Sequence, residues 1–261
     1  ARPARAQATT LAPTISQTRA KNRTGAENRA PVRSYDSLAP SAPVGDDAGA
    51  GGPNHFEDSM LQRLLVFLIA GWSGFLVMAI ELLSGRILAP NFGNSIYVWG
   101  GVITVFMLAL SVGYLLGGRW SLRDPSLRRL AALLIAGALA ATPVLFLADP
   151  LLDWLFDRIR DPRYGSLVSA TLLFFVPTAL AGTVSPYAVR LLVNESAQSG
   201  HCAGLLYFVS TFGSAAGTIL TSFYLVLHFE IDHILAGLLG ISLLIGLLAL
   251  SLGNFRHAPR Q

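Results

Sequence analysis

Six long apolar runs follow one another from Leu61 onward, and short polar links separate them. The runs cover about residues 61–83, 97–118, 130–148, 166–192, 204–228 and 231–252. A helix needs about 20 apolar residues to cross the roughly 30 Å hydrocarbon layer of a bilayer, and each run has about that length. Because no water reaches a spanning backbone, each segment must satisfy its own hydrogen bonds as a helix. The pattern predicts an all-α integral membrane protein with six transmembrane helices.

The same pattern divides the chain into three parts. Residues 1–58 are rich in Pro, Ala and Ser and poor in large apolar residues, so they are expected to form a disordered tail. Residues 59–254 form the expected transmembrane domain, and residues 255–261 form a short C-terminal tail. The first 26 residues carry five basic side chains and no acidic one, a composition that also fits an organellar transit peptide.

Composition and charge agree with a membrane protein and set its expected orientation. The chain is 52% apolar and 13% charged, whereas soluble domains are about 25% charged. The link 119–129 carries four Arg and one Asp, while the link after the fifth run carries Glu230 and Asp232 and no Arg. The positive-inside rule therefore places that basic link and both termini in the cytoplasm. We attribute the net charge of +4 to topology, expect no nucleic-acid partner, and favour a bacterial inner membrane over an organellar one.

Two segments of similar layout indicate that spans one to three and spans four to six repeat one plan. Ile80-Glu-Leu-Leu-Ser-Gly-Arg86 precedes a polar link and then a helix with Gly113-Tyr-Leu-Leu-Gly117. Val184-Ser-Pro-Tyr-Ala-Val-Arg190 precedes a polar link and then a helix with Gly213-Ser-Ala-Ala-Gly217. Three spans separate the copies, so equivalent helices run in opposite directions, which predicts two inverted three-helix repeats. The glycine pairs let helix backbones approach closely and predict packing within the chain or between subunits.

Through these segments the chain resembles the membrane region of spermidine synthase-like transmembrane proteins, a fused major-facilitator/spermidine-synthase family. The matching segments are residues 81–99, 182–190 and 204–218. Members of that family commonly carry a C-terminal domain that resembles aminopropyltransferases. The residues after the last expected helix are too few for such a domain, so we expect no aminopropyltransferase activity and no other enzyme activity. The link 117–129 also resembles a basic loop of major-facilitator transporters, and six helices are half of such a transporter.

Three charged residues are candidates for a solute or proton site. Glu81 is an acidic residue well inside the first span, where an ionisable group is costly and tends to face a cavity or another chain. It could bind a cation or relay a proton, or it could form a structural ion pair with Arg86. Arg190 holds the corresponding place in the second repeat, where snorkelling to the interface is the simpler explanation. Pro177 and Pro186 permit a bend or break in the fourth span.

The sequence gives little support for cofactor chemistry. The single cysteine, Cys202, excludes a multi-cysteine zinc site within this chain. His228 and His233 flank a short acidic link and are only a weak indication of a metal or haem site. We therefore expect no metal and no cofactor.

Two functional classes remain open. The first is a non-catalytic membrane subunit that docks in a larger complex, or in a homodimer, through its small-residue helix faces and its N-terminal tail. The second is a transport or binding module for a small solute, such as a polyamine-like cation, with Glu81 and Arg86 at its site. We favour the subunit, because the predicted spans contain mainly Leu, Ala, Gly and Val and few polar groups that could line a cavity.

Overall fold

The computed structural model describes residues 53–123, 125–193 and 199–254. The expected C-terminal tail 255–261 and most of the expected N-terminal tail lie outside these ranges. The first helix begins at Pro53, six residues before the expected start of the transmembrane domain at residue 59, and its span-forming part begins at Met60. Proline suits this position, because its missing N–H falls where a helix has no internal acceptor for one.

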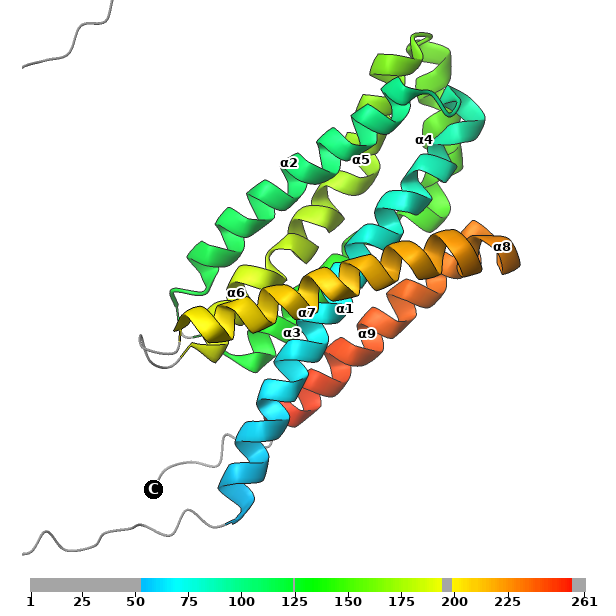
Figure 1. Cartoon of the computed structure of the whole chain (residues 1–261). Coiled ribbons are helices and arrows are strands. Elements are labelled where there is room, and N and C mark those ends of the chain that lie inside the picture. Colours follow the sequence, from blue (N-terminus) through cyan, green and yellow to red (C-terminus); the bar gives the residue numbers. More distant parts are fainter. Residues whose placement is uncertain (1–52, 124, 194–198, 255–261) are drawn as a thin grey trace, which may run out of the picture. The chain divides into compact units, whose positions relative to one another are not determined.

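The described residues form helices and connecting turns (Figure 1). Their bounds are α1 (Pro53–Phe92), α2 (Ile96–Trp120), α3 (Leu127–Ala141), α4 (Val144–Arg158), α5 (Pro162–Gly182), α6 (Val184–Leu192), α7 (Ser199–Leu220), the π-helical turn η2 (Thr221–Leu225), α8 (Val226–His228) and α9 (Ile231–Asn254). Five stretches are long and apolar enough to cross a membrane, and the bent pair of α3 and α4 makes a sixth if it is one span. The described part of the chain is therefore all-helical, and the length and composition of its helices are those of a multi-pass membrane protein.

Local signals in the sequence account for several helix ends. The Ser126 side chain accepts a hydrogen bond from the backbone N–H of Arg129 and caps the start of α3. Asp161 caps α5 in the same way, and Pro162 occupies the first helical position. At the end of α1, Gly93 adopts a φ of 78°, and its N–H bonds to the carbonyl of Ala89. Glycine fits this left-handed conformation without the steric cost of a Cβ atom.

Two spans are interrupted, and the structure corrects the sequence prediction at both. The third span was expected as one helix over 130–148, but α3 ends at Ala141 and α4 continues to Arg158 at an angle of 41°. Pro143 lies at this bend. It interrupts the helix because proline lacks a backbone donor and clashes with the preceding turn. In the fourth span, α5 runs unbroken through Pro177, and the interruption lies at Thr183. Pro186 lies three residues beyond it, in the first turn of α6.

Close packing of α2 against α5 depends on two glycines. A Cβ atom on Gly113 would overlap the carbonyl of Ala179 and lie 3.0 Å from Cα of Gly182. One on Gly117 would lie 2.8 Å from Cα of Thr183. Since real Cβ atoms do not approach backbone this closely, the helices could meet here only with glycine at both positions.

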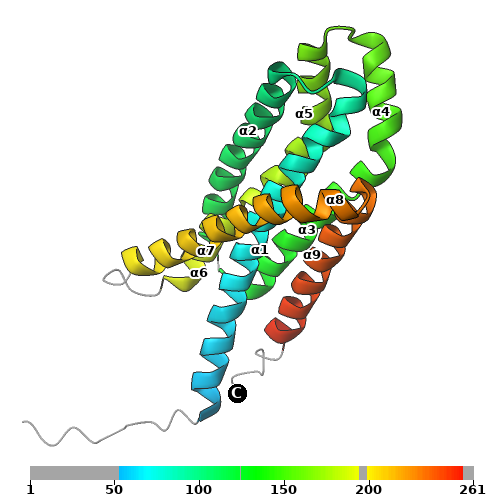
Figure 2. The same cartoon turned by 45° about the vertical axis from the view of Figure 1, so that its right-hand side comes forward.

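A second glycine pair brings α7 against α1, and both views show α7 crossing α1 (Figures 1 and 2). A Cβ atom on Gly213 would overlap the carbonyl oxygen of Gly71 and lie 2.9 Å from its carbon. One on Gly217 would lie 2.5 Å from the carbonyl oxygen of Phe75. Farther along, Gly74 of α1 packs on Ser210 of α7. The four glycines that the sequence marked for packing therefore make contacts within the chain.

Side-chain contacts hold the remaining helices around α1. One buried cluster includes Phe106 of α2 and Phe174 of α5, whose ring centroids are 5.9 Å apart. A second cluster gathers residues of α1, α3, α6, α7 and α9 around Tyr187, which is 1% exposed. The indole N–H of Trp72 in α1 donates a 2.8 Å hydrogen bond to the hydroxyl of Ser242 in α9. This bond fixes α9, which also packs along α3, against the centre of the bundle.

Candidate functional site

The three charged candidates do not meet in the structure. Glu81 is half-buried on α1, and among the described residues its carboxylate has neither an ion pair nor a hydrogen-bond donor. Only its backbone carbonyl is engaged, by the hydroxyl of Ser84 at 2.6 Å. Arg86 is exposed, and Arg190 lines a cavity at the opposite end of the bundle. The structure therefore does not bring the three candidates Glu81, Arg86 and Arg190 together in one site.

Arg86 lines a cavity of about 400 Å³ between the ends of α1, α4 and α9. Three carboxylates share the lining, from Asp149, Glu230 and Asp232. We call this region the Arg86 end of the bundle. Its charges lie on exposed helix ends, and the ion pair recorded there joins Glu230 to His233 at 3.4 Å. A cavity of mixed charge near water could admit a small cation, but it does not include Glu81 in its lining.

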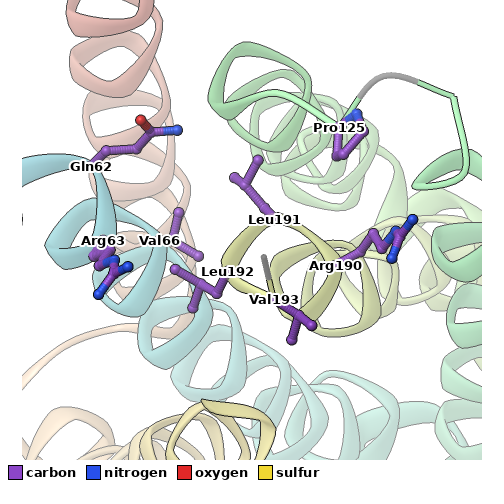
Figure 3. A pocket seen from close by; sticks show the side chains of 8 residues that line it. All are labelled: Gln62, Arg63, Val66, Pro125, Arg190, Leu191, Leu192 and Val193. Carbon is purple, nitrogen blue, oxygen red and sulfur yellow. The ribbon is translucent and has the colours of Figure 1, made fainter. Parts of the chain in front are cut away.

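The opposite end of the bundle carries a cavity of about 470 Å³ lined by residues of α1, α6 and the α2–α3 link. We call this region the Arg190 end. Figure 3 shows Arg63 of α1 and Arg190 of α6 on opposite sides of the cavity, with Val66 and Leu192 between them. Gln62 adds an amide to the rim. Both arginines are exposed, so their guanidinium groups are available to a ligand from the water phase.

A second hollow at the Arg190 end is a groove of about 460 Å³ along the surface of α3. Arg123 and Arg129 lie at the groove, and its other lining is predominantly apolar, from Trp120, Ala132, Leu133, Ala136 and Tyr187. Guanidinium groups form paired, charge-assisted hydrogen bonds to phosphates and carboxylates. The two hollows together give this end of the described structure the chemistry of an anion-binding surface.

Charge is distributed unevenly between the two ends. From residue 60 onward, the described residues of the Arg190 end include six arginines and no carboxylate: Arg63, Arg119, Arg123, Arg128, Arg129 and Arg190. Glu57 and Asp58 precede them in the first turns of α1. The Arg86 end combines four arginines with six carboxylates: Arg86, Arg158, Arg160, Arg163, Asp149, Asp153, Asp157, Asp161, Glu230 and Asp232. Sequence reasoning found the basic link but missed Arg63, whose position in α1 gave no indication that it would line the same cavity as Arg190.

The two histidines at the Arg86 end have local partners. Nδ1 of His228 lies 2.8 Å from the carbonyl oxygen of Tyr224, and the two rings stack at 4.5 Å. His233 pairs with Glu230. Within the described ranges, no group of three His, Cys, Asp or Glu side chains is close enough to hold a metal ion. The exposed charged side chains at both ends are candidates for binding small ions or charged head groups, without a metal cluster of that kind.

Comparison with known proteins adds no further constraint on the site. No known protein family matches the chain, and neither a curated protein nor a solved structure matches it.

Proposed function

We propose that the protein is a non-catalytic integral membrane subunit that docks to another membrane protein through the uncovered side of α7. The low burial of α7 carries this proposal. Only 11% of its most apolar window is buried within the chain, against 33–61% for the other four single spans. A helix that its own chain covers so little has the most surface left for a partner helix.

The uncovered side of α7 has the composition of a helix-packing surface. We define the α7 face by the exposed residues Gly204, Leu205, Phe208, Thr211, Phe212, Ala215 and Ile219. His201, Tyr207 and Leu220 are also exposed on α7 and border it. Thr211 and Ala215 form a small-x-x-x-small pair, the spacing that lets a second helix approach closely in a membrane. Phe208 and Phe212 stack beside them at 6.0 Å. Gly213 and Gly217, the small residues expected to dock a partner, already pack on α1. We therefore propose that a partner docks on the α7 face instead.

The half-buried carboxylate of Glu81 also favours a partner. An ionisable group at membrane depth is costly unless another group hydrogen-bonds to it. Among the described residues of this chain no such group reaches the Glu81 carboxylate. A donor from a partner subunit would remove that cost. The N-terminal tail, most of which lies outside the described residues, is proposed as a second docking arm because of its length and composition.

We further propose that the docking subunit is built as two inverted repeats. Gly213 and Gly217 lie 100 positions after Gly113 and Gly117. The residues on which they pack, Gly71 and Phe75, lie 108 positions before Ala179 and Thr183. Each offset is the same at both positions of its helix pair, so the α1–α7 contact corresponds residue by residue to the α2–α5 contact, which supports the repeat. With the positive-inside rule, the Arg190 end is assigned to the cytoplasmic side.

The docking proposal is tested by measuring the mass of the complex purified gently from native membranes. We expect the wild-type chain in a stoichiometric assembly with at least one other membrane protein. Ala215→Trp should release it, because the bulky side chain prevents close approach on the α7 face. Leu115→Trp is the matched control, since Leu115 is 71% exposed on α2, away from that face. A wild-type chain without partners, or equal loss with both variants, contradicts the proposal.

Transport or binding of a small cation is the second candidate function, and the Arg86-end cavity supports it. Its three carboxylates could hold an amine or a metal cation near the membrane surface. Uptake of radiolabelled spermidine into vesicles that contain the purified chain separates the two functions. Uptake that Glu230→Gln reduces supports transport, and uptake equal to that of protein-free vesicles supports the subunit.

A further inference from the structure

We infer that the groove along α3 at the Arg190 end binds an anionic phospholipid. The groove has two chemically different parts on one continuous surface. Arg123 and Arg129 supply positive charge at one part, and Ala132, Leu133 and Ala136 supply an apolar surface at the other. A phospholipid has the same two parts, a charged phosphate and an apolar chain. This binding is independent of docking through α7.

The sequence of α3 produces this arrangement directly. Residues 129, 132, 133 and 136 have the i, i+3, i+4, i+7 spacing that places side chains on one helix face. Over those seven steps the helix rises about 10 Å, which leads from the arginine down into the apolar part of the span. Ala132 and Ala136 are small, so the stripe is hollowed and leaves room for an extended acyl chain.

Neighbouring residues hold the arginines at the mouth of the groove. A guanidinium N–H of Arg129 donates to the backbone carbonyl of Arg123, which fixes the α2–α3 link against the start of α3. Tyr187 lines the groove, almost fully buried, and its hydroxyl accepts a 3.1 Å hydrogen bond from the N–H of Ser126. Arg123 is exposed and lines the groove, so its charge is accessible from the water phase.

The groove also lies at the right depth for a lipid. α2 ends at Trp120, and α3 begins at Leu127, so the link between them marks a membrane surface. Trp120 lines the groove and is 43% exposed, and an indole ring at this level is typical of the membrane–water interface. Basic hollows between transmembrane helices at such a surface select anionic head groups. An apolar stripe below the arginines has no role in holding a free phosphate ion, so we assign the groove to the lipid.

Lipid binding is measured on the purified full-length chain by native mass spectrometry, with dioleoyl phosphatidylglycerol and dioleoyl phosphatidylcholine as probes. We expect phosphatidylglycerol to bind more tightly, and Arg123→Gln to weaken it about fivefold, as expected for one arginine at a membrane surface. Arg128→Gln is the matched control, because Arg128 is exposed on the same helix but does not line the groove. Equal weakening by both variants overturns the site.

A second pair of variants tests the acyl-chain part. Ala132→Trp fills the groove and should lower phosphatidylglycerol binding, whereas Leu115→Trp, at a position 71% exposed on α2 that does not line the groove, should not. Thermal unfolding of each variant confirms that the fold is retained, since both positions are exposed. Unchanged binding by Ala132→Trp, or displacement of the lipid by millimolar inorganic phosphate, contradicts the lipid assignment and indicates a simple anion site.

Discussion

Replacing Gly213 with alanine should destabilise the bundle, although alanine is the better helix former. The new Cβ atom would overlap the backbone carbonyl oxygen of Gly71 and lie 2.9 Å from its carbon. Backbone cannot rotate aside as a flexible side chain can, so α1 and α7 would have to separate. That separation would weaken every contact along their shared interface.

The size of the effect follows from two opposing terms. Overpacking a closely packed site costs about 1–3 kcal/mol. Alanine returns up to about 1 kcal/mol over glycine in a helix interior. We therefore expect Gly213→Ala to lower the free energy of unfolding by about 1–2 kcal/mol. Gly204→Ala, on the same helix, should be neutral or slightly stabilising, because no atom lies within 4 Å of the position that its new methyl group would take.

Equilibrium unfolding of the purified chain in mixed micelles of dodecyl maltoside and sodium dodecyl sulfate measures the difference. Tryptophan fluorescence follows tertiary packing, and far-UV circular dichroism follows helix content. The expected result is an earlier transition for Gly213→Ala than for Gly204→Ala. Equal transitions would refute the close α1–α7 contact, and with it the main argument for the repeat register.

Three further variants are tested in the same unfolding assay. Trp72→Phe removes the hydrogen bond to Ser242 and should cost about 1 kcal/mol; no change would mean that this bond does not hold α9. Thr221→Val should stabilise by about 1 kcal/mol, because the buried hydroxyl of Thr221 has no hydrogen-bond partner among the described residues. Thr104→Val serves as its control, since Thr104 donates to a carbonyl at 2.7 Å and its loss should not stabilise. Glu81→Gln should leave the transition unchanged or slightly later, and a large loss of stability would reveal a partner within the chain.

Hydrophobic patterning predicted helices and six spans, and the structure has five single spans and a bent pair that makes a sixth if it is one span. This agreement arises because membrane depth imposes both length and composition on a span. It did not predict the bend at Pro143, because long apolar stretches flank Thr142 and Pro143 on both sides and no charged residue separates them. The interruption of the fourth span also lay at Thr183 rather than at Pro177. A proline within a transmembrane helix can be accommodated by neighbouring helices, so tertiary packing decides which one interrupts the helix.

The candidate site could be predicted only in part, because spacing in the sequence does not show which helices come into contact. Glycine spacing identified the packing positions, but only the structure shows which helices they join. Comparison of the sequence motifs matched Arg190 of the second repeat to Arg86 of the first. The glycine contacts instead relate α5 to α1 by 108 positions, and this offset, carried on to α6, matches Arg190 to Leu82, one helical turn before Arg86. The arginines around the α3 groove come from the α2–α3 link and α3, and its floor includes Tyr187 from α6. No local pattern indicates that these segments converge.

Site-specific photocrosslinking in native membranes tests the central claim of a docking subunit most directly. A benzoylphenylalanine residue at Phe212 lies on the α7 face, and one at Met107, 64% exposed on α2, is the control. We expect a single heavier adduct with a different membrane protein from position 212 and none from position 107. Absence of a protein adduct at position 212, together with a purified chain of monomeric mass, would contradict the docking role.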